Sequence, residues 1–182
     1  MNSGCLHGIV DLILGTNKQF FDENIQYAAL CTVVNVIAGN DANRVLIIEL
    51  NGIKPILTSI QTTSRDDILL EAIKALANIA YHSAFTAGWQ MLTLIRFPNN
   101  CFIISGCILK LGGDSVLVEV LETTDYLKHP YIAYTALAAL ANIVNCEATQ
   151  SHVGSAAGIR TGIVAVLLTE QKCYTIFIRR PS

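Results

Sequence analysis

The chain has 182 residues, of which 52% are hydrophobic and only 14% charged, so it can bury a large core and is not an intrinsically disordered chain. Its net charge of −2 and its pI near 6.0 provide no basic surface, so we expect no nucleic-acid partner. The six cysteines form no C-x-x-C pair and match no zinc framework, so we expect reduced, mostly buried thiols, no metal and no cofactor.

The apolar stretches are too short to span a membrane. The stretch AFTAGWQMLTLI ends at Arg96 and CFIISGCIL ends at Lys110, well short of the roughly 20 residues that a spanning helix needs. We interpret both as buried helices rather than as a hairpin inserted in a membrane. No secretory leader follows Met1, because Asp11 interrupts the first apolar run. We therefore expect a cytoplasmic protein, with the nucleus as the alternative compartment.

Four apolar segments, each the length of about three helical turns, have a glycine at their first or second position. We interpret each glycine as the end of one helix and the segment that follows as the next helix. In chain order the segments are HGIVDLIL from His7, NGIKPILTSI from Asn51, GGDSVLVEVL from Gly112 and AGIRTGIVAVLL from Ala157.

Three further helices, each with an asparagine near its end, follow the first three of these segments. They contain ALCTVVN at 29–35, AIKALAN at 72–78 and ALAALAN at 136–142. Small or apolar residues stand six, three and two positions before each asparagine, which places them on one face of a helix. Alanine on that face allows another helix to approach closely. The pair His129-Pro130 predicts the start of the last of these helices, with proline at its first position.

The spacing of these markers indicates a tandem repeat with one insertion. From glycine to the next asparagine the distances are 27, 26 and 29 residues, and from asparagine to the next glycine they are 17, 35 and 16. The middle interval is about 18 residues too long for units of roughly 42–46 residues, so we place an insertion at about 89–106. We predict one domain over 1–182, with units at 8–51, 52–111 and 112–157, a partial unit at 158–170 and an irregular tail at 171–182.

The insertion and the tail differ from the repeat in their sequence pattern. The run Phe97-Pro98-Asn99-Asn100 breaks any helix. The ending KCYTIFIRRPS has no third-helix pattern. Two interpretations stay open: aberrant sequence, such as a retained intron and a read-through end, or a genuine surface loop or extra helix.

The order of these elements resembles the armadillo repeat, whose unit is a short helix, a second helix with the pattern GGIPxLVxLL and a long third helix with the pattern AxxALxNLA. Residues 112–121 match the second helix, and 72–80 and 136–144 match the third. The segment DANRVLIIELNG is similar to the first helix, with Asn43-Arg44 in the expected places. The resemblance covers roughly residues 8–170 apart from the insertion, and the HEAT repeat is the alternative.

This resemblance implies an all-α fold: an armadillo-type α-α superhelix, that is, a right-handed solenoid of three-helix repeats. It implies a non-enzymatic protein–protein interaction scaffold that binds an extended peptide or partner segment in its concave groove. The alternative function is a structural fragment of a larger armadillo solenoid without its own ligand. Uncapped repeat ends would in that case favour self-association.

The resemblance also implies the binding residues. In armadillo proteins, asparagines on the third helices hold the main chain of an extended peptide, and the matching positions are Asn35, Asn78 and Asn142. A carboxamide suits this role because it offers both donors and an acceptor. The alternative is that each asparagine bonds the local backbone of its own protein.

The positions four residues before the asparagines argue against a nuclear-import signal as the ligand. Importin-α-like proteins have tryptophan there, whereas this chain has Cys31, Lys74 and Ala138. Catenin-type grooves bind acidic ligands with rows of lysine and arginine. Lys74 is the one residue here that matches such a row, so we include it as a peptide-binding candidate.

No group of residues stands out as catalytic. Cys146 and His152 lie six residues apart with Glu147 between them, but no oxyanion turn accompanies them. No glycine-rich nucleotide-binding motif occurs. We expect that the protein is not an enzyme and that its partner is another protein.

Overall fold

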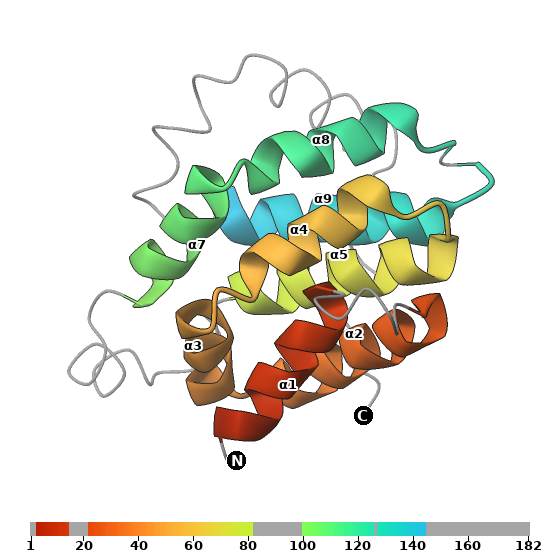
Figure 1. Cartoon of the computed structure of the whole chain (residues 1–182). Helices are drawn as coiled ribbons and strands as arrows, with labels where there is room; N and C mark the ends of the chain where they lie inside the picture. The colour runs from red at the N-terminus through yellow and green to blue at the C-terminus, as the bar shows by residue number, and fades with distance from the viewer. Residues whose placement is uncertain (1–2, 15–21, 82–99, 126, 145–182) are drawn as a thin grey trace, which may run out of the picture.

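The structure is a computed structural model that describes residues 3–14, 22–81, 100–125 and 127–144. Within these ranges it contains eight α-helices and no strand, which confirms the predicted all-α fold (Figure 1). The helices are α1 (Ser3–Leu14), α2 (Glu23–Ile37), α3 (Asp41–Glu49), α4 (Ile53–Thr62), α5 (Asp66–Ala80), α7 (Asn100–Lys110), α8 (Gly113–Thr123) and α9 (Pro130–Val144). None of them is both long enough and apolar enough to cross a bilayer.

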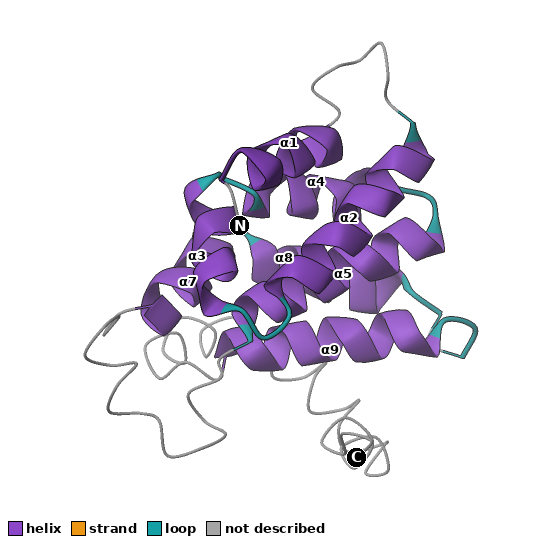
Figure 2. Ribbon diagram, turned by 90° about the horizontal axis from the view of Figure 1, so that it is seen from below, coloured by secondary structure: helices purple, strands orange, loops and turns teal. Residues whose placement is uncertain are grey.

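The helices repeat in sets of three. The helices α3, α4 and α5 form one set, and α7, α8 and α9 form the next, whereas α1 and α2 correspond to the second and third helices of a preceding set. Helices of the same kind lie side by side: α5 packs between α2 and α9, and α4 packs between α1 and α8. The row of third helices is seen most clearly in Figure 2. The fold is therefore an α-solenoid.

The third helices pack closely because their inner faces carry alanine. In α5 the buried residues include Ala72, Ala75 and Leu76, as the spacing predicts. Ala136 and Ala139 of α9 are fully buried at the equivalent positions. Methyl groups fill little space, so the helix axes can approach one another while larger side chains complete the core.

The junction between a first and a second helix is built in the same way in both sets. Asn51, two residues before α4, and Gly112, directly before α8, adopt positive φ angles of 56° and 74°. At the next position, a Cβ on Gly52 would lie 2.9 Å from the main-chain oxygen of Ile47, and a Cβ on Gly113 would lie 3.0 Å from that of Ile108. Glycine is therefore required there because the first helix passes too close for any side chain.

The helix α7 begins at Asn100, so residues 100–106, the last part of the range predicted as an insertion, lie in a first helix. The helix α9 begins at Pro130, as the His129-Pro130 pair predicts. Several predicted features lie outside the described residues: Trp89, Cys146, His152, the partial unit at 158–170 and the tail at 171–182.

A buried polar network joins α1 and α2 to α4 of the next set. Gln26 of α2 is only 6% exposed. Its Nε2 donates to Ser59 Oγ of α4 at 2.9 Å and to the main-chain oxygen of Ile13 of α1 at 3.3 Å. Ser59 Oγ donates in turn to the main-chain oxygen of Pro55. The buried side-chain polar atoms of this network all have hydrogen-bond partners. The network therefore fixes the relative positions of three helices.

Candidate functional site

The outward faces of α2, α5 and α9 form one continuous surface, because α5 packs against both of the others (Figure 2). Residues eleven, eight and four positions before each asparagine share its helix face, since these spacings are close to whole turns. We call this the third-helix surface. Its twelve residues, all of them at least partly exposed, are Asn24, Tyr27, Cys31, Asn35, Asp67, Leu70, Lys74, Asn78, Tyr131, Tyr134, Ala138 and Asn142.

The asparagines occupy equivalent places on neighbouring helices. Asn142 Nδ2 donates to the main-chain oxygen of Ala77 at 3.0 Å, and Asn78 Nδ2 donates to that of Val34 at 3.4 Å. Ala77 directly precedes Asn78, and Val34 directly precedes Asn35. Each half-buried asparagine thus contacts the third helix before it at the same point of the repeat. Asn35, on the first of these helices, is exposed.

Lys74 lies one turn before Asn78 on the same face of α5. Its Nζ lies 2.7 Å from Oε1 of Glu71, with side-chain exposures of 41% and 13% respectively. The positive charge at this point is therefore compensated within α5.

Tyr27 of α2 has a raised pKa. A hydrogen bond with Cys31 is the largest cause. The carboxylates of Glu71 and Asp67 on α5 raise this pKa further, because a phenolate would be repelled by them.

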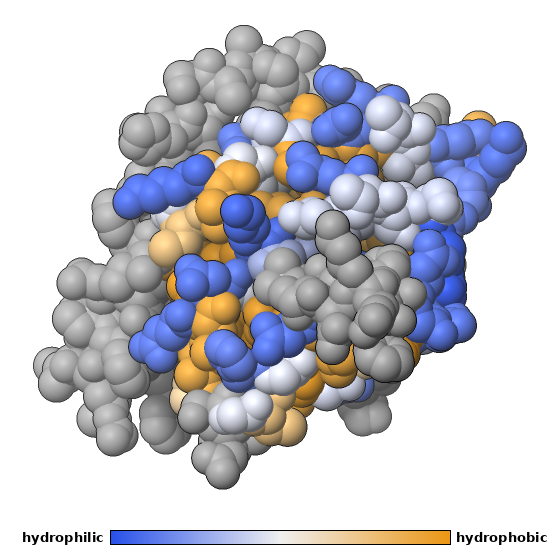
Figure 3. All heavy atoms as spheres, viewed as in Figure 1, coloured by the Kyte–Doolittle hydropathy of each residue, from blue (hydrophilic) through white to orange (hydrophobic). Residues whose placement is uncertain are grey.

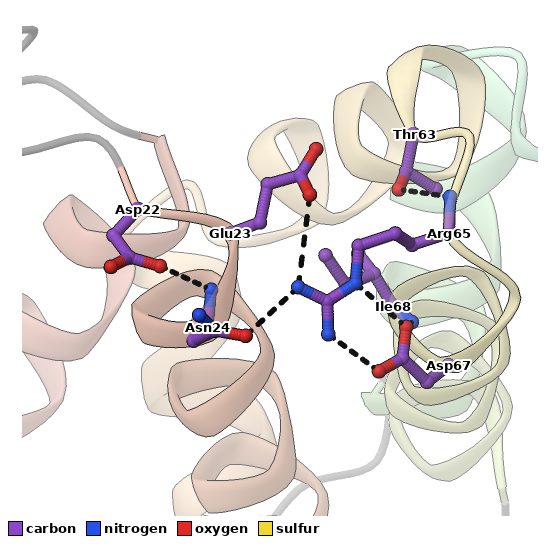
Figure 4. Close-up of polar contacts among 7 residues, drawn as sticks. All are labelled: Asp22, Glu23, Asn24, Thr63, Arg65, Asp67 and Ile68. Atoms are coloured by element: carbon purple, nitrogen blue, oxygen red, sulfur yellow. Dashed lines mark hydrogen bonds and ion pairs between the residues drawn. The ribbon is translucent and has the colours of Figure 1, made fainter.

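A polar cluster lies at the beginning of the third helices (Figure 4). Arg65 donates to both carboxylate oxygens of Asp67, at 2.7 and 3.1 Å, and to Asn24 Oδ1 of α2 at 3.0 Å. Glu23 Oε2 of α2 lies 3.7 Å from the same guanidinium. The hydrogen bond with Asp67 raises the pKa of Arg65, and in return it lowers the pKa of Asp67.

The helices α5 and α9 are joined by a contact at positions equivalent to those that join α2 and α5. Arg65 directly precedes α5 and pairs with Glu23, the first residue of α2. His129 directly precedes α9, and its Nδ1 lies 3.1 Å from Oδ2 of Asp66, the first residue of α5. The sequence patterns considered above do not predict this pairing of a basic residue before one third helix with an acidic residue at the start of the preceding one. A comparison of the aligned repeats could have found it.

A second polar cluster joins the start of α3 to the end of α5. Arg44, only 3% exposed, donates to the main-chain oxygen of Tyr81 and pairs with Asp41. Its guanidinium also lies 5.8 Å from the centroid of the Tyr81 ring. Burial lowers the pKa of Arg44. The sequence places Arg44 on a first helix but gives no sign that it reaches the end of the third.

The described residues contain no cluster of three or more histidine, cysteine or acidic side chains arranged to hold a metal ion.

The stacked three-helix sets form an α-solenoid of the kind that armadillo repeats build. Residues 40–81 match the Armadillo/beta-catenin-like repeat family, and α3, α4 and α5 lie within that match. The resemblance to the armadillo family is thereby confirmed. The family's unit begins at a first helix, near residue 40, whereas the glycine spacing divides the chain before a second helix, at residue 52.

The chain is also similar in structure to two engineered proteins, both with crystal structures from the Northeast Structural Genomics Consortium. The first has a TM-score of 0.66 and 25% identity, and the match covers 94% of this chain and 34% of that protein. The second has a TM-score of 0.65 and 24% identity, with 94% and 62% covered. This chain therefore spans less than two thirds of either protein. No curated protein has a significant sequence match to it.

Proposed function

We propose that this armadillo-type repeat protein is a non-catalytic scaffold that binds an extended segment of a protein partner along the third-helix surface. Armadillo repeats are commonly used for protein binding. The observation that carries the proposal is the row formed by Asn35, Asn78 and Asn142, whose members stand at one equivalent place on each of three adjacent helices. Lys74 adjoins this row. We expect the partner in the cytoplasm.

The hydrogen bonds of Asn78 and Asn142 are compatible with this role. A carboxamide has two N–H donors and an oxygen acceptor, and the bond to the preceding helix uses one donor. That bond also fixes the direction of the side chain, which reduces the entropy lost when a ligand binds. The row could then pair with the N–H and C=O groups of an extended main chain.

The same bonds favour a second candidate function, that of a structural piece of a longer solenoid without its own ligand. In that case the asparagines serve only to align the third helices. The two functions differ in one consequence: a ligand contacts the third-helix surface only in the first.

Photo-crosslinking tests the difference. Tyr131 of α9 is 75% exposed, and benzoylphenylalanine can replace it with little change of shape. The matched control carries the same group at Leu12 of α1, which is 50% exposed on a second-type helix. The full chain would be expressed in its own cells and irradiated, and the products would be analysed by mass spectrometry.

We expect a partner segment to be crosslinked from position 131 and not from position 12, and Asn35→Ala to weaken this crosslink. A partner crosslinked equally from both positions, or from neither, would support the structural role instead. Circular dichroism must show that every variant has the helix content of the wild type.

A further inference from the structure

The third-helix surface carries almost no free charge. Lys74 and Asp67 are the two formally charged side chains among its twelve residues. Glu71 lies 2.7 Å from Lys74 Nζ and compensates it, and Arg65 holds Asp67 in two hydrogen bonds. A strongly basic or strongly acidic ligand would therefore find no complementary charge, and it would have to break one of these pairs to obtain one.

Apart from these two residues and the asparagines, the surface is aromatic, aliphatic or small. The positions eight residues before the asparagines are Tyr27, Leu70 and Tyr134, all half-buried. Next to them, at four residues before, α2 and α9 have only the small side chains Cys31 and Ala138. Large side chains thus stand beside small ones on this surface. Tyr131 extends the aromatic row toward the start of α9.

From this arrangement we propose that the ligand is an extended, uncharged segment of a partner protein that inserts aliphatic or aromatic side chains between the third helices. This inference rests on the proposed function and names the chemistry of its ligand. Apolar side chains gain free energy from burial against the tyrosines. The asparagine row meanwhile forms hydrogen bonds with the main chain of the ligand, whose N–H and C=O groups the apolar side chains of the segment cannot satisfy.

The repeat also sets the length of the segment. Packed helices lie about 8–10 Å apart, so three third helices extend over about 20 Å between their outer axes. An extended chain rises about 3.3 Å per residue, so about six or seven residues cross the surface. Alternate side chains of such a segment point toward the protein, which gives about three anchoring positions.

Selection from a random library of displayed linear peptides, about twelve residues long, tests this proposal on the full chain. Selected peptides would be synthesised, and their affinities would be measured by fluorescence anisotropy between about 50 and 500 mM salt. The variants are Tyr131→Ala and Asn35→Ala on the third-helix surface. Lys54→Ala on α4 is the matched control, because Lys54 is exposed on a second helix.

We expect the selected peptides to be poor in charged residues and rich in alternating apolar ones. Their affinity should change less than about twofold with salt. It should fall about tenfold or more with Tyr131→Ala, because tyrosine anchors often dominate binding, and remain unchanged with Lys54→Ala.

Selected peptides that are acidic, or rich in lysine and arginine, and whose binding still depends on Tyr131 and Asn35 would overturn only this inference. Failure to select any peptide, or affinities that neither surface variant changes, would overturn the proposed function as well. These two failures are therefore distinguishable in one experiment.

Discussion

The side chain of Asn142 donates a hydrogen bond from Nδ2 to the main-chain oxygen of Ala77, 3.0 Å away and 65 residues earlier in the chain. Ala77 directly precedes Asn78, which makes the equivalent contact with Val34 of α2. One side chain per repeat thus ties each third helix to the main chain of the one before it. At the other end of the same helices, pairs of a basic and an acidic residue repeat in register in the same way.

The contact of Asn142 predicts a measurable loss of stability. We expect Asn142→Ala to lower the free energy of unfolding by about 1 kcal/mol relative to Asn35→Ala, because a half-buried hydrogen bond is lost only in the former. Alanine is the better helix former at both sites, so the difference between the two variants isolates the bond. Urea unfolding followed by circular dichroism measures it. Equal effects of the two substitutions would contradict the structural role of the bond.

The helix junctions predict opposite effects for two glycine substitutions. Gly113→Ala should destabilise the protein by about 1–3 kcal/mol, because the new Cβ would collide with Ile108 of α7. Gly106→Ala, within α7, should stabilise it by about 0.5–1 kcal/mol, because no atom lies within 4 Å of the added methyl group and alanine favours the helix. Thermal unfolding of both variants compares them directly. A stabilising Gly113→Ala would contradict the close packing described here.

The sequence predicts the local features of this fold well. Alanines at helical spacing predict the buried faces of α5 and α9, and the glycines predict the junctions before α4 and α8. Both signals are local, since they depend on the period of a helix and on a backbone conformation. The position of the insertion is less well determined, because distances between markers fix its length but not its place. As α7 begins at Asn100, we propose that the extra residues precede that helix.

Contacts between repeats could not be predicted with the same certainty. The pairing of Arg65 with Glu23 and of His129 with Asp66 depends on the register between neighbouring third helices, which a single pattern does not reveal. For the same reason the sequence left two roles open for the asparagines. Two of them bond to a neighbouring helix, and peptide binding by the row remains a prediction.

The buried pair Gln26 and Ser59 should show strong energetic coupling. Ser59→Ala removes the acceptor that lies 2.9 Å from Gln26 Nε2 and leaves this buried amide with fewer partners. Gln26→Ala removes the amide itself, so Ser59→Ala should cost less in that background. We expect a coupling energy of about 0.5–3 kcal/mol from a double-mutant cycle in urea. Strict additivity of the two substitutions would show that the pair contributes nothing.

The cluster around Arg65 predicts a pH dependence of stability. The hydrogen bond with Arg65 is the largest cause that lowers the pKa of Asp67 in the folded protein. A carboxyl group whose pKa is lower in the folded than in the unfolded state stabilises the fold above the unfolded value, about 4 for aspartate, and this contribution is lost as the pH falls through the folded value. Wild type should therefore melt at a higher temperature than Asp67→Asn at neutral pH.

The difference between the two melting temperatures should shrink on acidification below about pH 4 and disappear once Asp67 is protonated in the folded state as well. Because the cluster is exposed, salt should also reduce the difference. The matched control is the same pair of proteins in an Arg65→Met background, where most of the pH dependence should be absent. A difference that stays constant from neutral to acidic pH would show that the ion pair seen in Figure 4 does not stabilise the fold.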